Sequence, residues 1–208
     1  MAKVKIGNVF PSDEYLLTRC APTGYGLGVS ALKAVDDCDN AVKNGWYLIN
    51  ASAANSPFRN AHGAMRVDVH TTSHIVQTAY SGAFTGKGVV ILRRVMFSGV
   101  WQEWEYITPL MVVGDEYRTT ERWQGKAVYT KLVDCGAMPN AESKIVAHNC
   151  AAIMMLRCCG TTNLGATIPY RWNDSYTAVS ADRTNIHLCT NADFSSQTCM
   201  VQLWYTKD

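Results

Sequence analysis

Several short segments of the chain alternate between apolar and polar residues, and turns separate them. Residues 65–70 alternate strictly, with a methionine and two valines separated by arginine, aspartate and histidine. A period of two places the apolar side chains on one face of a β-strand and the polar ones on the other. Further segments of strand composition, separated by turn residues, lie at 45–49, 75–80, 89–97 and 101–106. This spacing predicts an all-β unit, with residues 50–55 as a polar loop.

A second set of predicted strands follows residue 116. The segment 128–133 is rich in β-branched and aromatic residues, and Gly136 and Pro139 end it. The last residues of the chain repeat, at 205–207, the Tyr-Thr-Lys sequence of 129–131. We expect the segments 128–133 and 201–207 to pair as neighbouring strands, which would close the C-terminal part of the chain into one β domain.

The residues between these two strands read as further strands and polar turns. In 153–159 both alternating faces are apolar except at Arg157, which favours a strand covered on one side by its own core and on the other by a neighbouring subunit. Segment 167–170 is a short edge-like piece because of its proline, and 171–176 is expected to be a polar loop with aromatic residues. Alternation at 185–190 and a closing strand at 198–206 complete a pattern typical of a β-sandwich or jelly roll.

Composition bears on the expected assembly and partners. Only 17% of the 208 residues are charged, against roughly 25% in ordinary globular chains, while 48% are hydrophobic. A monomer would therefore have an unusually charge-poor surface, which favours an oligomer. The net charge of +2, with no run of lysine and arginine, gives no reason to expect nucleic acid as a partner.

No apolar run approaches the ~20 residues that span a bilayer, and no apolar core follows the basic N-terminus. We therefore expect a protein made in the cytoplasm, without membrane insertion. Its eight cysteines form no Cys-x-x-Cys pair, and we expect free thiols that pack as small apolar residues. They are Cys20, Cys38, Cys135, Cys150, Cys158, Cys159, Cys189 and Cys199.

Candidate catalytic and metal-binding groups are present but poorly spaced. The five histidines lack the spacing of metal ligands on one strand face, so we expect solvated side chains, no metal and no cofactor. A cysteine nucleophile could pair Cys135 with His148, or Cys189 with His187, which share a strand face. Core packing is the better account of Cys189.

Glycoside hydrolysis needs two carboxylates held across one cleft. The candidates Asp174, Asp182 and Asp193 fall in polar loops, where solvated acids are the ordinary finding. The cluster Gly24-x-Gly26-x-Gly28 lacks the ending of a phosphate-binding loop, and no apolar strand leads into it. We therefore expect neither catalytic residues nor a nucleotide site.

Residues 44–106 contain a series of short motifs in order. They are Gly45-Trp46-Tyr47, Asn55-x-Pro57-Phe58, Gly63 before the alternating strand, Val76-Gln77-Thr78-Ala79-Tyr80, Arg93-Arg94 and Trp101-x-Glu103-Trp104. This series resembles the small β knob module of pyocin and phage tail fibres.

The motif series continues beyond residue 106. It comprises Glu116-Tyr117-Arg118-Thr119-Thr120-Glu121-x-Trp123-x-Gly125-Lys126-x-Val128-Tyr129 and Gly136-Ala137-x-Pro139-Asn140-x-x-Ser143-Lys144. These residues resemble the start of the C-terminal head in tail-fibre proteins of phages and prophages of Gram-positive bacteria. The resemblance implies an attachment arm at 1–43, a knob at 44–116 and a head at 117–208, assembled as a homotrimer. In such a trimer we expect Arg157 near an acidic group or the threefold axis, because an unpaired buried guanidinium is costly.

The resemblance implies a non-enzymatic receptor-binding protein of a virion tail. Its arm would bind other tail or baseplate proteins, and its head would recognise a bacterial surface polysaccharide or teichoic acid. A tail-associated glycan hydrolase and a structural baseplate or decoration protein are the alternatives.

We expect receptor contact in the head loops 160–165, 170–176 and 190–196, because aromatic rings stack on sugars and Asn or Asp side chains bind their hydroxyls. If the head loops do not bind the receptor, we expect the contact in the knob loops 50–62 and 81–88. The candidate residues are Trp172, Asn173, Asp174, Tyr176, Asn163, Asn191 and Asp193.

Overall fold

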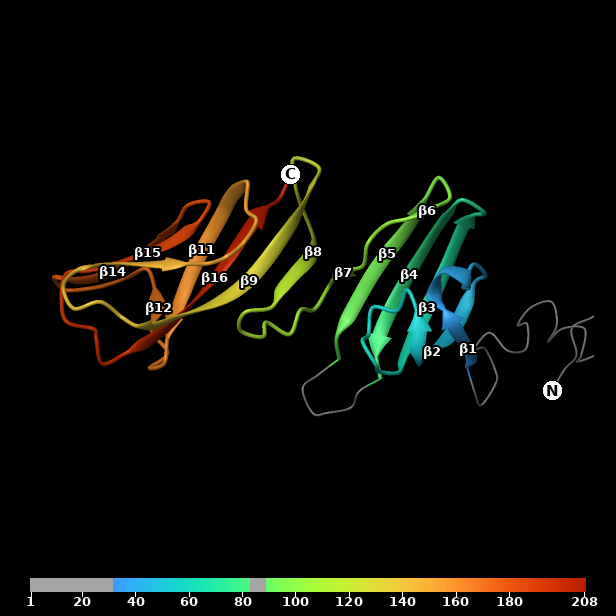
Figure 1. Ribbon diagram of the computed structural model, residues 1–208, viewed down its shortest axis with the longest axis horizontal. Helices are drawn as coiled ribbons and strands as arrows, with labels where there is room; N and C mark the ends of the chain where they lie inside the picture. Colours follow the sequence, from blue (N-terminus) through green and yellow to red (C-terminus); the bar gives the residue numbers. More distant parts are fainter. Residues whose placement is uncertain (1–31, 83–88) are drawn as a thin grey trace, which may run out of the picture. The chain divides into compact units, whose positions relative to one another are not determined.

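The computed structural model describes residues 32–82 and 89–208, and the chain divides into two compact units between Thr108 and Pro109 (Figure 1). We call them unit 1 and unit 2. Apart from one 3₁₀ turn, the regular elements of the described residues are β-strands, which confirms the predicted all-β fold. The Gly24–Gly28 cluster, Cys20 and most of the loop 81–88 lie outside the described residues.

Unit 1 is built on one sheet in the order β1-β2-β3-β4-β5-β7, with β6 paired to β5. β1 runs parallel to β2, and the following pairs are antiparallel. The elements are β1 (Lys33–Asp37), the 3₁₀ turn η1 (Cys38–Asn40), β2 (Gly45–Ala54), β3 (Gly63–Thr71), β4 (His74–Ser81), β5 (Ile91–Phe97), β6 (Val100–Trp101) and β7 (Glu105–Tyr106).

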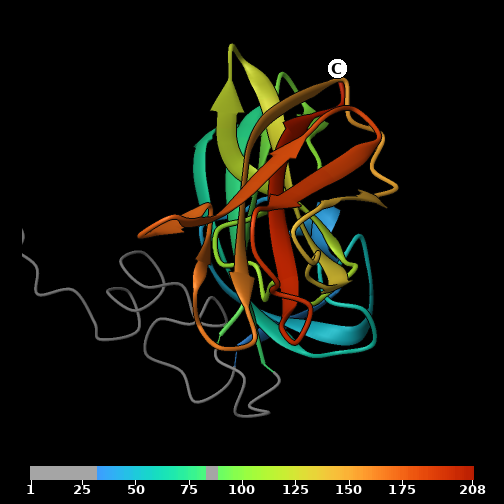
Figure 2. The ribbon, with the colours of Figure 1, turned by 90° about the vertical axis from the view of Figure 1, so that its left-hand side faces the viewer.

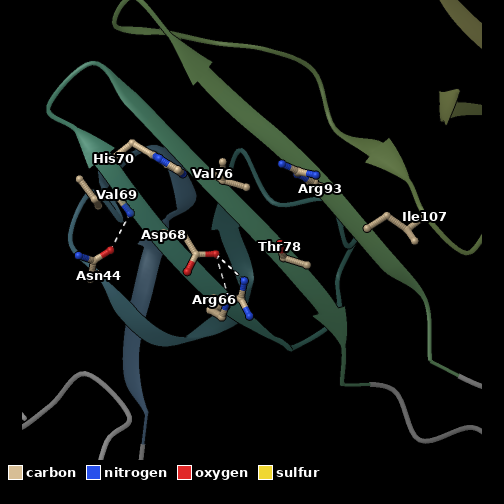
Figure 3. Close-up of a pocket in the computed structure, with 9 residues that line it drawn as sticks. All are labelled: Asn44, Arg66, Asp68, Val69, His70, Val76, Thr78, Arg93 and Ile107. Carbon is tan, nitrogen blue, oxygen red and sulfur yellow. Dashed lines mark hydrogen bonds and ion pairs between the residues drawn. The ribbon is translucent and has the colours of Figure 1, made fainter. Parts of the chain in front are cut away.

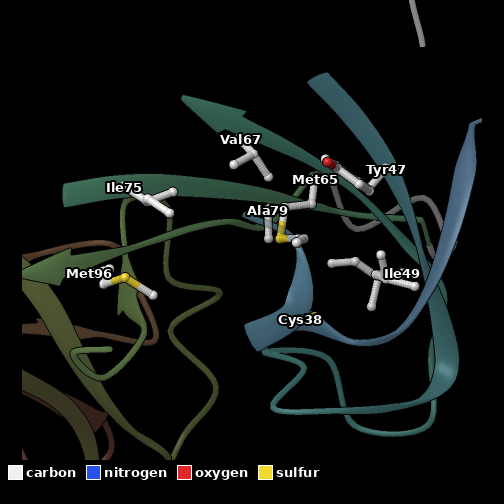
Figure 4. Packing of buried hydrophobic residues seen from close by; sticks show 10 residues of the cluster. Cys38, Tyr47, Ile49, Met65, Val67, Ile75, Ala79 and Met96 are labelled. Atoms are coloured by element: carbon white, nitrogen blue, oxygen red, sulfur yellow. The ribbon is translucent and has the colours of Figure 1, made fainter. Parts of the chain in front are cut away.

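The core of unit 1 lies on one face of this sheet (Figure 4). Met65 and Val67 point into it from β3, as the alternation of this strand predicts, and Arg66 stays exposed on the other face. η1 closes the core, because Cys38 is fully buried beneath the sheet. Asp37 caps η1 by accepting a hydrogen bond from the Asp39 N–H at 2.9 Å, as expected of an acidic residue before a short helix.

Two parts of unit 1 differ from the sequence expectations. Residues 33–41, which we placed in an arm over 1–43, form β1 and η1 and contribute Val35, Cys38 and Ala41 to the core. The expected loop 50–55 is mostly strand, because β2 continues to Ala54. Small polar and alanine residues gave this part of the chain no strand signal, and within it Ala54 pairs with Asp37 of β1 after a shift in register.

A buried polar network links the sheet of unit 1 to η1. The fully buried Gln77 amide donates to the carbonyl oxygens of Cys38 at 2.7 Å and Ala41 at 3.0 Å, and accepts from Arg94 Nε at 2.8 Å. Arg94, only 5% exposed, forms an ion pair with Asp39 at 2.7 Å. Burial lowers the pKa of the Arg94 guanidinium, and the Asp39 carboxylate opposes that change.

Aromatic residues complete this network. The Arg94 guanidinium lies 4.3 Å from the ring centre of Trp101 and 4.5 Å from that of Trp104, and Trp104 donates to the Asn55 carbonyl at 2.9 Å. A Cβ on Gly63 would lie 2.5 Å from the Phe58 ring, so only glycine fits there. The motif residues of the knob resemblance therefore hold unit 1 together.

Unit 2 contains two sheets, one in the order β8-β9-β16-β11-β12 and the other β10-β15-β14-β13 (Figures 1 and 2). The strands are β8 (Glu116–Trp123), β9 (Lys126–Ala137), β10 (Ser143–Ala147), β11 (Met154–Thr162), β12 (Thr167–Ile168), β13 (Tyr170–Trp172), β14 (Ser175–Ala181), β15 (Asn185–Thr190) and β16 (Thr198–Thr206). Gln124 and Gly125, both with positive φ, form the two-residue turn between β8 and β9.

The predicted pairing of the first and last segments is confirmed. β9 and β16 are antiparallel neighbours, with Tyr129 opposite Tyr205 and Val133 opposite Val201. The inner face of β16 packs against that of β15, where Ile186 and Leu188 are fully buried. Side chains of both sheets thus share one core, as in a sandwich.

The loop expected at 171–176 is a β-hairpin. β13 pairs with β14 from Tyr170 opposite Thr177 to Trp172 opposite Ser175, so only Asn173 and Asp174 form the turn. β10 and β14 carried no strand prediction. Both pair with β15 in the smaller sheet, and this pairing decides their conformation.

The outer face of β11, which we expected a neighbouring subunit to cover, is exposed in the single chain. Ile153 and Met154 are 49% and 46% exposed, and Met200 on the neighbouring β16 is 44% exposed. Arg157 lies beside an acidic group as expected, since its Nη2 donates to both carboxylate oxygens of Glu121 at 2.9 and 3.0 Å. Its guanidinium also stacks 4.4 Å from the Trp204 ring centre.

Candidate functional site

Three segments of unit 2 border one pocket of about 210 Å³. They are the turn after β11, the segment from β12 to β13, and the turn before β16, which overlap the three predicted receptor loops. The lining includes Leu164, Ile168, Tyr170, Thr177, Phe194 and Gln197. Apolar and aromatic side chains with a few polar groups are typical of a small-ligand pocket.

The floor and rim of this head pocket differ in burial. Ile168 and Thr177 are 1% and 4% exposed, so they form a rigid floor, whereas Leu164 at the rim is 74% exposed. The Thr177 hydroxyl has no hydrogen-bond partner among the described residues. This hydroxyl oxygen is itself buried, so the accessible lining of the pocket is mainly apolar.

The hairpin β13 to β14 brings several predicted residues together. Asn173 adopts a φ of 51°, which asparagine tolerates at a tight turn. The Asn191 side chain donates to the Asp174 carbonyl at 2.6 Å and accepts from the Tyr176 N–H at 2.7 Å. Asn191 therefore fixes the hairpin, while the Tyr176 ring is 41% exposed.

Two other predicted residues also support backbone. Asn163 accepts a hydrogen bond from the Thr198 N–H at 3.0 Å, which ties the turn after β11 to β16. Asp193 accepts from the N–H and hydroxyl of Ser195 at 2.9 and 2.7 Å, and these bonds lower the pKa of Asp193. Both side chains shape their loops rather than offering all their polar atoms to a ligand.

A second depression of about 340 Å³ shares Thr162 with the head pocket. Its lining is more polar and includes Asp134, Asn163, Thr198 and Met200. The turn after β11 thus separates two hollows on unit 2.

In the part of the chain that the structure describes, neither His148 nor His187 forms a hydrogen bond with the side chain of its candidate cysteine partner. His187 Nε2 lies 2.8 Å from Asp182 Oδ2, so the imidazole pairs with a carboxylate rather than with the Cys189 thiol. This contact, together with N–H donors from Thr184 and Asn185, holds the pKa of Asp182 well below its usual range. The pair stabilises the turn before β15.

His148 was expected to be solvated and is instead 1% exposed. Its Nδ1 accepts from the Cys150 N–H at 3.0 Å, and its Nε2 lies 3.2 Å from the Asp182 carbonyl. The free Cys135 thiol donates to the Val133 carbonyl at 3.8 Å, and a hydrogen bond with the neighbouring Cys199 thiol, together with burial, raises the pKa of Cys135. Within residues 32–82 and 89–208, no three His, Cys, Asp or Glu side chains gather as a metal site.

Unit 1 carries a larger groove of about 590 Å³ on the face opposite its core (Figure 3). Side chains from β3, β4 and β5 line it, among them Arg66, Asp68, His70, Thr78 and Arg93. The Asp68 carboxylate raises the pKa of the Arg66 guanidinium, with which it forms an ion pair at 2.7 Å. We call this the unit 1 groove.

Comparison with solved structures finds similarity to pyocin tail fibres. An N-truncated R2-type pyocin tail fibre shares 13% identity, with a TM-score of 0.31, over 85% of this chain and 98% of that chain. The R1 and R2 pyocin fibres of P. aeruginosa share 13% and 12% identity, with TM-scores of 0.31 and 0.32, over 85% of this chain and 67% of theirs. No protein-family model matches the sequence, and no curated protein matches it significantly.

The predicted receptor loops overlap the segments that border the head pocket, but the candidate residues named from the sequence do not line it. Tyr170, Leu164 and Phe194 were not among the candidate residues. Leu164 is an apolar residue within a polar turn, and that pattern is a sequence signal for a binding surface. The unit 1 groove was missed because its residues appeared as the ordinary polar face of a half-buried strand. Within the described residues, no helix has the length and hydrophobicity needed to cross a membrane.

Proposed function

We propose that this chain is a non-enzymatic receptor-binding protein in the tail of a phage or phage-like particle. Unit 2 contacts a glycan on the bacterial surface, through the loops around the head pocket. The motif series in residues 45–144 supports the tail-fibre assignment. The convergence of three separate loops on one partly aromatic pocket carries the binding role.

The chemistry of the head pocket suits a sugar. Tyr170 and Phe194 offer aromatic surface for the apolar face of a sugar ring, and Gln197 offers polar atoms for its hydroxyls. The volume of about 210 Å³ is below the roughly 300–1,000 Å³ of pockets that enclose a drug-sized ligand. It therefore suits one unit of a longer surface polysaccharide or teichoic acid. Trp172, Asn173, Asp174 and Tyr176 extend the contact along the neighbouring hairpin.

The protein acts as a homotrimer in this proposal. β11 and β16 expose Met154 near one end of their pairing and Met200 near the other, and in this proposal a second copy covers their outer surface. Three weak sugar sites on one particle tip would act together through avidity. The residues before Lys33 attach the trimer to other tail or baseplate proteins, which places the protein in the virion tail.

Adsorption of the full chain to whole cells tests the proposal. Trp172→Ala and Tyr170→Ala should each weaken adsorption about fivefold per site, since a stacked aromatic ring contributes about 1 kcal/mol beyond its buried area. Avidity would enlarge this loss on a trimer. Trp123→Ala is the matched control, because Trp123 is an exposed tryptophan on the β8 to β9 hairpin of the same unit.

The outcome is read together with the melting temperature and the mass in solution. Weaker adsorption with unchanged mass and melting temperature supports the proposal. Normal adsorption by both head variants contradicts it. Binding to purified particle components without adsorption to any cell would favour a structural baseplate protein instead.

A further inference from the structure

The unit 1 groove is a built polar surface that the proposed function does not use. Its residues lie side by side across the strands, since Arg66 pairs with Thr78 and Thr78 with Arg93. Figure 3 shows Arg66, Asp68 and Arg93 rising from the same face of the sheet. Two guanidinium groups from different strands therefore border one hollow.

Arg66 is held in place by a local contact. Its Nε and Nη2 both donate to Asp68 Oδ2, at 2.9 and 2.7 Å. Its Nη1 makes no hydrogen bond to any described residue, and the side chain is 49% exposed. The ion pair with Asp68 thus orients the Arg66 guanidinium and leaves its Nη1 available to donate to a ligand.

Arg93 is the second donor and differs from Arg66. It is exposed and, within residues 32–82 and 89–208, its side chain makes no hydrogen bond or ion pair. Its neighbours across the strands are Thr78 and Glu105. A free guanidinium above a groove can bind a carboxylate or phosphate through two parallel N–H donors.

An aromatic pair adjoins these charges on the same face. Trp46 lies opposite Arg66 across the β2 to β3 pair, and its ring centre is 5.6 Å from that of Tyr80. Both residues are only partly buried. Aromatic surface beside charged donors is the combination that stacks a sugar ring and binds its acidic substituent.

We propose that the unit 1 groove binds an acidic saccharide, a sugar unit that bears a phosphate or a carboxylate. Arg93 and the free edge of Arg66 bind the anionic group, Asp68 and Thr78 accept or donate to hydroxyls, and Trp46 with Tyr80 supports the ring. This site is additional to the head pocket, so the chain contacts the bacterial surface at two chemically different places.

Biolayer interferometry with the full chain tests this proposal against three polymers. Phosphomannan and neutral mannan differ by the phosphate, and polygalacturonate supplies a carboxylate. Wild-type protein should bind at least one acidic polymer about tenfold more tightly than mannan, and the preferred acid identifies the source of the negative charge. Higher salt should weaken this binding, because exposed charges are screened.

Matched variants locate the site. Arg93→Gln and Arg66→Gln should each weaken binding to the acidic polymer by about tenfold, since a hydrogen bond to a charged group contributes about 1.5–3 kcal/mol. Arg59→Gln removes the same charge from an exposed position of unit 1 outside the groove and should leave binding unchanged. Each variant should keep the wild-type melting temperature.

Three results would overturn the proposal. They are equal binding of wild type to mannan and both acidic polymers, equal binding by Arg93→Gln and Arg59→Gln, and a change of oligomer mass in Arg93→Gln with binding intact. The last would make this face an interface between copies. Because the head variants are tested on whole cells, failure of the groove leaves the proposed function standing, and failure of the head pocket leaves the groove standing.

Discussion

Unit 1 buries an arginine and a glutamine, whereas unit 2 buries mostly threonine hydroxyls and one imidazole. In unit 1, Gln77 and Arg94 tie β4 and β5 to η1, which lies more than thirty residues earlier in the chain. In unit 2, Thr119 and Thr190 donate to backbone carbonyls at 2.8 and 3.1 Å. The first arrangement requires several residues to match at once, and the second requires only one side chain and a backbone atom.

This difference distinguishes the residues that specify the fold from those that are free to contact a receptor. Gln77, Trp101 and Trp104 of the knob motifs contact Arg94, so they specify the fold of unit 1 and are poorly placed to contact a receptor. Trp46, Thr78 and Arg93 of the same motifs lie in register with Arg66 on the open face of the sheet. The head loops are held by hydrogen bonds from Asn163, Asn191 and Asp193 to backbone N–H groups, so their other side chains can change without altering the core. We therefore place receptor binding on the head loops and on the open face of the unit 1 sheet.

The largest effect should come from the apolar core of unit 2. Leu203 is fully buried between the two sheets, so Leu203→Ala leaves a cavity and should cost about 3 kcal/mol of unfolding free energy. Chemical denaturation followed by tryptophan fluorescence measures the loss. A cost below 1 kcal/mol would mean that the sheets do not share the core described above.

The neighbouring arginines of unit 1 give a sharper contrast. Arg94→Gln leaves Asp39 and Gln77 without their partner and should cost about 2–3 kcal/mol, somewhat less than a fully buried pair because Asp39 is partly exposed. Arg93→Gln, one position away but on the outer face, should change stability by less than about 0.5 kcal/mol. Similar costs for the two variants would contradict the division between a structural and a free arginine.

Acid should weaken the turn that Asp182 holds in unit 2. Its pKa is depressed in the folded protein, so its contribution is complete above the unfolded value near 3.9 and is lost as the pH falls below it. Asp182→Asn should therefore melt at a lower temperature than wild type at pH 7, and the difference should shrink at pH 3. If the difference in melting temperature did not depend on pH, the stabilising effect of Asp182 would come from its packing and hydrogen bonds rather than from its charge.

The smallest effects concern the thiols. Burial raises the pKa of Cys38 to about 11, and Cys199 is only 1% exposed, so both should resist alkylation in the native protein. Exposed Cys159 should be alkylated first. Thiol titration in denaturant should find eight free groups, and stoichiometric zinc by elemental analysis would contradict that expectation.

Much of the strand arrangement could be predicted from the sequence, where periodicity and composition agree. The strict alternation of 65–70 gave the correct faces of β3, and the repeated Tyr-Thr-Lys sequence indicated the β9 to β16 pair. Polar or small residues hid β1, β10 and the β13 to β14 hairpin, because those strands are stabilised by their neighbours rather than by their own pattern.

The sites were harder to predict than the strands. Loop composition indicated the three head segments, but not that Asn163, Asn191 and Asp193 would bind backbone. His148 appeared solvated because one of its partners, the Asp182 carbonyl, is distant in the sequence, although the other, the Cys150 N–H, is only two residues away. Contacts between segments distant in sequence decide such roles, and one sequence does not show them.

The most direct test of the central claim is binding of the full chain to purified cell walls, before and after their polysaccharides and teichoic acids are removed. We predict saturable binding to intact walls, loss of that binding from stripped walls, and no release of reducing sugar during incubation. Equal binding to both wall preparations would contradict a glycan receptor. Reducing sugar released in proportion to protein concentration would instead identify a hydrolase.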